Sequence, residues 1–303
     1  MTDKRKSLIQ IICGMLLFGP IGIVKQLIIK GGSGIDSGIF SVARGFFGAA
    51  ALLVFIFVCG KKPDFKAIKP KLWLMLLSGA MIGFNWVLLF EAADRTGVSV
   101  ATLCYYFAPI IVILLSPVIF REKLTAKKLM CVAAAVAGMM MISGVFGDDV
   151  NGDITGIIMG LCAAVLYAGV IISNKFLGEL PAYEKTVVQL ASAGAVVLPY
   201  ALINESVDAS AIDAKTWILL VVAGLLLTGL PYALYFGSMK SLSGQSVALI
   251  SYIDPITAII LSAIVLDERM GVLEIVGAVL VLGATIISEL PEKRRKNDTE
   301  SDV

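Results

Sequence analysis

Long apolar runs alternate with short polar clusters along the whole chain. Each run is roughly 20 residues long, which is the length that a helix needs to cross the hydrocarbon core of a bilayer. The connections between the runs are short and leave no room for a soluble domain. The pattern predicts an all-α, polytopic membrane protein with ten transmembrane helices. The predicted spans are residues 8–29, 36–59, 72–91, 98–120, 127–144, 154–174, 183–203, 216–238, 244–266 and 271–289.

Composition agrees with this pattern. Apolar residues make up 58% of the chain and charged residues 16%, with a mean hydropathy of +0.91. Soluble domains have about 45–50% apolar and about 25% charged residues. The basic start Lys4–Lys6 followed by an apolar run looks like a signal peptide, but the run reaches Ile29 without a small-residue cleavage site. We therefore interpret this run as an uncleaved first span.

The distribution of Lys and Arg predicts the orientation of the spans, because cytoplasmic loops are enriched in these residues. If the N-terminus is placed in the cytoplasm, most Lys and Arg fall on the inner side. The outer loops then hold only Lys30, Arg95, Lys215 and Arg269. We expect both termini in the cytoplasm. The compact chain without extensions favours a bacterial inner (cytoplasmic) membrane.

An internal repeat aligns the two halves of the chain at one constant spacing. The aligned residues are Tyr106 with Tyr252, Pro109 with Pro255, Ser116 with Ser262, and Glu122-Lys123 with Glu268-Arg269. The repeat contains five spans. Because five is odd, the second copy must enter the membrane from the opposite face, which is the inverted arrangement found in many secondary transporters. We predict a first repeat at 8–144, a second at 154–289 and a charged cytoplasmic tail at 290–303.

Two copies of a helix with proline three residues after tyrosine, each followed by a Glu-(Lys/Arg) turn, give the chain its most specific features. In these segments, and over nearly its whole length, the chain resembles the EamA-type transporters of the drug/metabolite transporter superfamily. The resemblance implies a 5+5 inverted bundle, a central cavity, and export or exchange of small metabolites such as amino acids. The tryptophan-glycine start of the first helix in that family is replaced here by Phe18-Gly19-Pro20.

Asp254 is the first candidate for a functional side chain. It lies near the middle of its predicted span, where a carboxylate costs several kcal/mol unless it faces a cavity or a partner. The following Pro255 frees a backbone carbonyl and helps to form a polar pocket. We predict that Asp254 binds a substrate amine or couples transport to protons, and the alternative is a structural pair with Lys25 or Arg44. Its repeat mate is Ala108, so the fold does not require this charge.

Arg44 also lies inside a predicted span and cannot be neutralised by deprotonation. It needs either an anionic ligand, such as a substrate carboxylate, or a counter-charge from Asp254 or Glu91. Its approximate repeat mate is the polar Gln189, which we also expect at the cavity. Lys25 near the outer end of the first span is a further candidate, although snorkelling to the headgroups explains it equally well.

Polar and aromatic side chains complete the predicted site. Asn85 and Trp86 lie in the outer half of the third span. Tyr106 and Tyr252 are repeat mates close to the midplane, and we predict that they line the cavity; ordinary helix packing is the alternative.

Four repeated residues are predicted to be structural. Glu122 and Glu268 lie at helix ends, where a carboxylate accepts backbone N–H groups of the next helix. Pro109 and Pro255 are expected to kink their spans and to supply hinge points.

Several activities lack their sequence signals. The chain has no histidine, its five cysteines show no CxxC spacing, and Gly31–Gly34 is not followed by the Lys-Ser/Thr of a P-loop. We therefore expect no metal, no cofactor and no enzymatic activity. The expected partners are a small-molecule substrate and the lipid bilayer, with no nucleic acid, and the protein is expected as a monomer or homodimer.

The favoured function is a secondary transporter, in particular an exporter, that moves a small metabolite by alternating access of the two inverted repeats. One alternative is a proton- or substrate-exchange antiporter of an organic anion. Another is a non-transporting membrane scaffold or scramblase.

Overall fold

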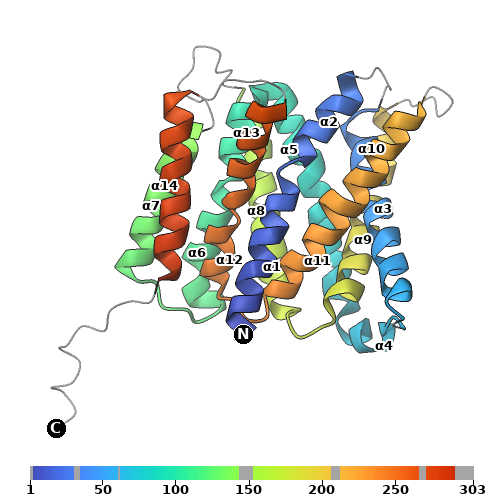
Figure 1. The fold of residues 1–303 in the computed structure, drawn as a ribbon, viewed down its shortest axis with the longest axis horizontal. Coiled ribbons are helices and arrows are strands. Elements are labelled where there is room, and N and C mark those ends of the chain that lie inside the picture. The colour runs from blue at the N-terminus through green and yellow to red at the C-terminus, as the bar shows by residue number, and fades with distance from the viewer. Residues whose placement is uncertain are drawn as a thin grey trace, which may run out of the picture.

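The computed structural model describes residues 3–30, 35–60, 62–142, 153–205, 212–265 and 271–290. Within these ranges the regular structure is helical throughout and contains no strand (Figure 1). The elements are α1 (Asp3–Phe18), α2 (Ile21–Lys30), α3 (Ser37–Val58), α4 (Phe65–Ile68), η1 (Lys69–Lys71), α5 (Leu72–Tyr105), α6 (Phe107–Ile119), α7 (Ala126–Ile142), α8 (Ile154–Phe176), α9 (Ala182–Asn204), α10 (Ala214–Gly224), η3 (Leu225–Gly229), α11 (Leu230–Ser238), α12 (Gly244–Ile250), α13 (Ile253–Val265) and α14 (Val272–Glu289).

Helices occupy all of the predicted spans. Within the described ranges, eight helical segments are long and apolar enough to cross a membrane. The other two predicted spans correspond to α7, which has 17 residues, and to the pair α12–α13, which is interrupted at Ser251–Tyr252. Outward-facing apolar residues such as Val118 and Ile203, each 81% exposed, fit a surface solvated by lipid. The predicted all-α, polytopic fold is confirmed.

Glycine and proline set the main breaks between helices. Gly19-Pro20 separates α1 from α2, and Pro20 has no N–H to continue the hydrogen-bond ladder. Gly97 has φ +80° and ψ 157°, a conformation for which glycine is the suitable residue. The predicted break between spans 72–91 and 98–120 is present, but it is shorter than expected: the helix runs on to Gly97, and a second helical segment follows it to Tyr105.

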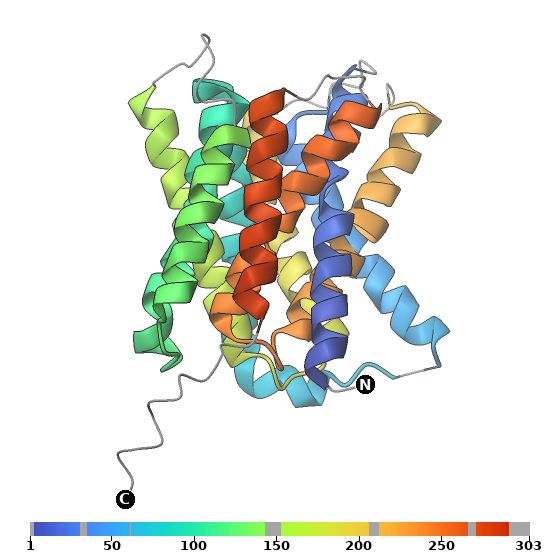
Figure 2. The ribbon, with the colours of Figure 1, turned by 60° about the vertical axis from the view of Figure 1, so that its left-hand side comes forward.

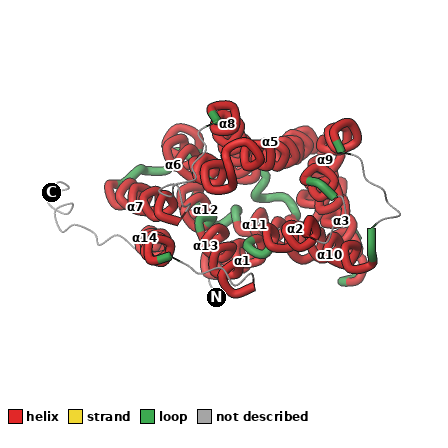
Figure 3. The backbone as a smooth tube through the Cα atoms, turned by 90° about the horizontal axis from the view of Figure 1, so that it is seen from above, coloured by secondary structure: helices red, strands yellow, loops and turns green. Residues whose placement is uncertain are grey.

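The helices form two rows (Figure 3). Row A contains α5, α6, α8 and α9, and row B contains α1–α3, η3 and α10–α13. Contacts between α3 and α9 join the rows at one end, and the α7–α14 pair stands at the other end (Figures 1 and 3). Figure 2 shows that α1 begins at the end of the bundle opposite to the start of α8.

Each helix of row A has its repeat mate in row B: α8 repeats α1, α9 repeats α3, and α6 repeats α13. Exchange of the two halves therefore exchanges the two rows. Tyr252 donates a hydrogen bond from its hydroxyl to the carbonyl of its mate Tyr106 (2.9 Å), as mates can do where they lie near a two-fold axis. The two-repeat architecture is confirmed. The rows do not coincide with the two halves of the sequence, because each row contains helices from both halves.

Candidate functional site

Arg44 is held in position in the first half of α3. Its side chain is buried, with 6% exposure, and its Nε donates a hydrogen bond to Thr228 Oγ1 at 3.1 Å. The guanidinium carbon lies 4.1 Å from the centre of the Trp86 ring. A cation over a tryptophan face gains up to about 2 kcal/mol when both groups are desolvated. The arginine is thus oriented by one hydroxyl of row B and one aromatic ring of row A.

Thr228 reaches Arg44 because the helix around it is irregular. Residues Leu225–Gly229 form a π-helical turn, and Pro231 follows immediately. Single π-turns inside α-helices are often found at functional sites, since they shift the following side chains. Thr228 is not among the residues predicted from the sequence. The signal that could have found it is the segment Gly229-Leu230-Pro231, which interrupts regular helix bonding inside an apolar span.

Asp254 lies in the first turn of α13, directly after the break at Ser251–Tyr252. Its side chain is partly exposed, and it interacts electrostatically with Arg44. Among the described residues, its carboxylate has no hydrogen bond and no ion pair with Arg44 or Lys25. The helix N-terminus stabilises a negative charge at this position. The carboxylate and the guanidinium therefore face the same region without neutralising each other by direct contact.

Tyrosines surround this charged pair. The rings of Tyr105 and Tyr167 stack with centroids 5.2 Å apart, and the Tyr167 hydroxyl donates to the Tyr235 hydroxyl at 3.3 Å. Tyr105 and Tyr232 both interact electrostatically with Asp254. The aromatic rings come from both rows, whereas Arg44 lies on row B, as Asp254 does. The site therefore presents charged groups and aromatic rings to one another within the bundle.

The predicted tyrosines lie at the contact between the two halves of the site. The rings of Tyr106 and Tyr252 are 6.1 Å apart in an edge-to-face arrangement, and Tyr252 is almost fully buried. Tyr106 interacts electrostatically with Asp254. Together with Trp86 and Arg44, these are the predicted residues that the structure brings together.

Three other predicted residues contact groups outside this cluster. Asn85 is buried between α5 and α8, where its amide donates to the Ala163 carbonyl at 2.7 Å. Gln189 is fully buried and donates to Ser78 Oγ at 2.8 Å. Lys25 lies on α2 with its ammonium 3.6 Å from the centre of the Phe90 ring.

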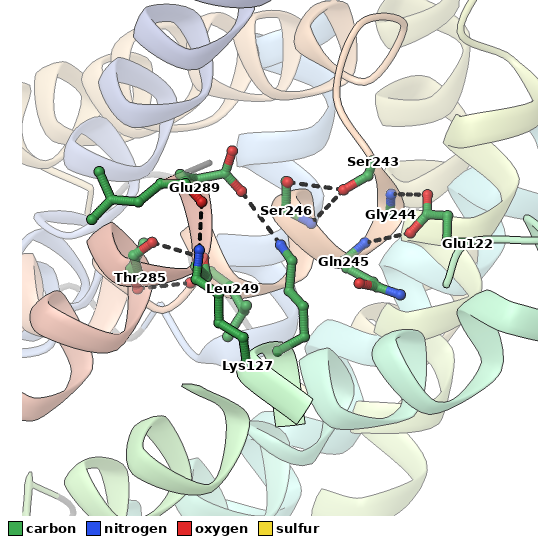
Figure 4. A network of polar contacts seen from close by, with 12 residues as sticks. Glu122, Lys127, Ser243, Gly244, Gln245, Ser246, Leu249, Thr285 and Glu289 are labelled. Atoms are coloured by element: carbon green, nitrogen blue, oxygen red, sulfur yellow. Dashed lines mark hydrogen bonds and ion pairs between the residues drawn. The ribbon is translucent and has the colours of Figure 1, made fainter. Parts of the chain in front are cut away.

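The structural residues act across the repeats. Glu122 accepts hydrogen bonds from the backbone N–H groups of Gly244 (2.6 Å) and Gln245 (3.1 Å), as Figure 4 shows. It therefore supports the start of α12, in the other half, and not the start of the next helix along the chain. Glu268 lies outside the described residues.

Pro109 and Pro255 each lie in the first turn of a helix, α6 and α13. Proline fits a first turn without kinking it, so these helices begin close to the prolines rather than bending at them. The interruptions occur just before, at Tyr106 and at Ser251–Tyr252.

Candidate metal ligands are not clustered in the described part of the chain, where no three His, Cys, Asp or Glu side chains gather into a possible metal site. The residues that do gather at the centre offer charge and aromatic surface. Apolar helices of membrane-spanning length, two rows related by an internal repeat, and a charged aromatic site between them define a multi-pass membrane protein of the transporter class.

The sequence signature of the EamA-like transporter family matches this chain twice, over residues 5–144 and 154–289. The chain belongs to this family, which confirms the resemblance stated above, and it is a membrane transporter.

Individual proteins are also similar to the chain. The chain is 26% identical to the uncharacterized transporter YxxF of Bacillus subtilis, over 98% of this chain and 94% of the relative. It is 25% identical to protein PecM of Dickeya dadantii, over 71% and 73% of the two chains. A protein of solved crystal structure superposes with a TM-score of 0.82 at 15% identity and covers 95% of this chain, which supports the fold alone.

Proposed function

We propose that the protein is a secondary transporter that exports a small amphoteric metabolite, such as an amino acid, by alternating access. The observation that supports this best is the pair Arg44 and Asp254. Both lie in the interior of the helix bundle, they carry opposite charges, and they have no direct ion pair with each other. Such groups are costly inside a membrane unless they bind something.

A zwitterion matches this pair. Arg44 already uses its Nε on Thr228, so the terminal nitrogens remain to receive a carboxylate. A substrate ammonium group would bind Asp254 at the N-terminal end of α13. The stacked rings of Tyr105 and Tyr167 would then pack against the apolar part of the substrate.

The rows offer a route to alternating access. The two rows meet at the centre, and Tyr106 and Tyr252 contact each other there. Because the halves repeat one another, tilting row A against row B in opposite senses gives two equivalent states that open to opposite sides. The breaks at Gly19-Pro20 and Ser251–Tyr252 are positions where row B can bend.

A proton- or substrate-exchange antiporter of an organic anion is the second candidate. It is favoured by the presence of two cationic side chains, Lys25 and Arg44, along one side of the interior, which interact electrostatically with each other. In that case Asp254 would not touch the substrate and would alternate between a proton and Arg44.

Counterflow in proteoliposomes tests the proposal. Vesicles containing the purified protein are loaded with an unlabelled amino-acid mixture, and the uptake of each labelled amino acid is measured with and without a pH gradient. We expect uptake of at least one zwitterion, which Arg44→Gln and Asp254→Asn both abolish. The exposed Lys62→Gln on the predicted cytoplasmic side is the control and should transport normally.

Uptake of organic anions that requires Arg44 but tolerates loss of the Asp254 charge would favour the antiporter. If neither class of solute enters under any gradient, although the protein is folded and inserted, the transport proposal for this site is wrong.

A further inference from the structure

A basic pocket of about 340 Å³ lies where the N-terminal end of α1 meets the start of α7 and the end of α14. Its lining includes four lysines and one carboxylate: Lys4, Lys123, Lys127, Lys128 and Glu289. Lys4 and Lys128 lie 3.5 Å and 3.6 Å from Glu289, so one carboxylate is shared by two ammonium groups. The pocket keeps an excess of positive charge.

Hydroxyl groups line the opposite wall of the basic pocket. Ser243 and Ser246 are hydrogen-bonded to each other at 2.8 Å, and Ser288 lies beside Glu289 at the end of α14. Figure 4 shows Ser243 and Ser246, at the start of α12, near Glu289. Lysine ammonium groups together with serine hydroxyls are donors suited to the oxygens of a phosphate.

An apolar groove between α7 and α14 continues from the basic pocket. This groove also has a volume of about 340 Å³ and shares Lys127 with the pocket. Its walls include Met130, which is 67% exposed, and Val279, which is 65% exposed. Both side chains would face lipid in a membrane. The polar pocket and the apolar groove thus form one continuous, amphipathic depression.

Two glycines show how closely α7 and α14 approach each other along their length. A Cβ added at Gly138 would lie 2.7 Å from the Gly277 carbonyl oxygen, so the two helices touch there. A Cβ added at Gly283, in the groove, would meet nothing within 4 Å. α7 and α14 are therefore in close contact at one end and separate toward the basic pocket.

We propose that this depression binds one anionic phospholipid, with its phosphate in the basic pocket and an acyl chain in the α7–α14 groove. Charge complementarity selects an anionic headgroup, because basic pockets between helices at the cytoplasmic side recognise such lipids. The adjoining apolar groove selects a lipid over a soluble phosphate. A second copy of the chain fits less well, because two identical lysine clusters would repel each other.

Native mass spectrometry of the full-length protein in detergent tests this site, with phosphatidylglycerol, phosphatidylcholine or inorganic phosphate added. We expect one tightly bound phosphatidylglycerol and much weaker binding of phosphatidylcholine. The double variant Lys123→Gln/Lys127→Gln should bind phosphatidylglycerol about 25-fold more weakly, from about fivefold for each lysine.

A groove-filling variant separates the two parts of the ligand. Gly283→Leu places a side chain in open space, so we expect a folded protein that binds phosphatidylglycerol at least fivefold more weakly. Inorganic phosphate that displaces the lipid completely, with no effect of Gly283→Leu, would overturn the proposal in favour of a soluble-anion site. Equal binding of both lipids, or a dimer in place of the lipid adduct, would also overturn it. If Gly283→Leu does not fold, the double lysine variant decides the question.

Discussion

The two halves of the molecule place the same tyrosine and proline around different residues. The first half has Ala108 between Tyr106 and Pro109, and Ala108 is fully buried. The second half has Asp254 in the corresponding position, partly exposed and electrostatically coupled to Arg44. The tyrosine and the proline therefore belong to the shared fold. The acid belongs to one half only, so the shared fold does not require it, which agrees with the proposed role of Asp254 in binding substrate.

The tyrosines themselves also differ between the halves. Tyr252 donates its hydroxyl hydrogen bond to the backbone of Tyr106, whereas the Tyr106 hydroxyl makes no hydrogen bond to the described residues. Two equivalent tyrosines that meet near a symmetry axis cannot both place their hydroxyl groups at the same point. Here the Tyr252 hydroxyl donates, and the Tyr106 carbonyl accepts. The two repeat mates thus differ in their contacts at the centre of the protein, beside the proposed substrate site.

The strongest test of the comparison is the charge of Asp254. Asp254→Asn should reduce transport on the order of 100-fold or more, because the neutral amide no longer attracts a cationic group in a desolvated site. Initial rates of counterflow provide the measurement. Moving the acid in Asp254→Ala/Ala108→Asp should not restore transport, since position 108 is fully buried. Restored transport in this exchanged variant would mean that the two halves are functionally equivalent.

Arg44→Lys keeps the positive charge that faces Asp254 but changes the group that carries it. We expect transport to fall about tenfold, mainly through weaker substrate binding, because an ammonium group cannot keep the Thr228 bond and also receive a carboxylate with two nitrogens. The concentration dependence of counterflow separates binding from turnover. An unchanged half-saturation concentration would show that Arg44 does not contact the substrate.

Glu122→Ala tests the structural contact between the halves. It leaves the N–H groups of Gly244 and Gln245 without their acceptor, which costs about 1–3 kcal/mol. Thermal unfolding in detergent should therefore shift to lower temperature, with a smaller shift for Glu122→Gln. Loss of transport without loss of stability would contradict a structural role.

The smallest expected effect concerns the paired tyrosines. Tyr252→Phe removes a hydrogen bond worth about 1 kcal/mol, and Tyr106→Phe removes none to the described residues. The first variant should unfold at a slightly lower temperature than the second. Equal stabilities would show that the asymmetry at the centre has no energetic consequence.

The helical spans were predictable because hydropathy is a local property. Predicted and observed boundaries agree closely for span 183–203 and α9 (Ala182–Asn204), and for span 271–289 and α14. Gly97 is an exception. At Gly97, a single residue with positive φ takes the place of the longer loop that we expected. The sequence around a glycine does not indicate whether the helix ends there or continues in a new direction.

The candidate site was predictable in its charges but not in its geometry. Asp254 and Arg44 could be selected because a charge inside an apolar run is rare. The roles of Asn85 and Gln189 could not be predicted in the same way, because a buried amide can either face a cavity or hydrogen-bond to a neighbouring helix. Here both amides donate to a neighbouring helix. Thr228 depends on a π-turn and on a partner far away in the sequence, so its role required the tertiary fold.

The ion pair between Lys4 and Glu289 has a consequence for how the chain can be connected. It joins the first helix to the last on one face, at 3.5 Å. The chain order of the two halves is therefore not dictated by their packing. A gene that starts at α8, runs to α14, and continues through a short linker into α1–α7 would encode the same bundle.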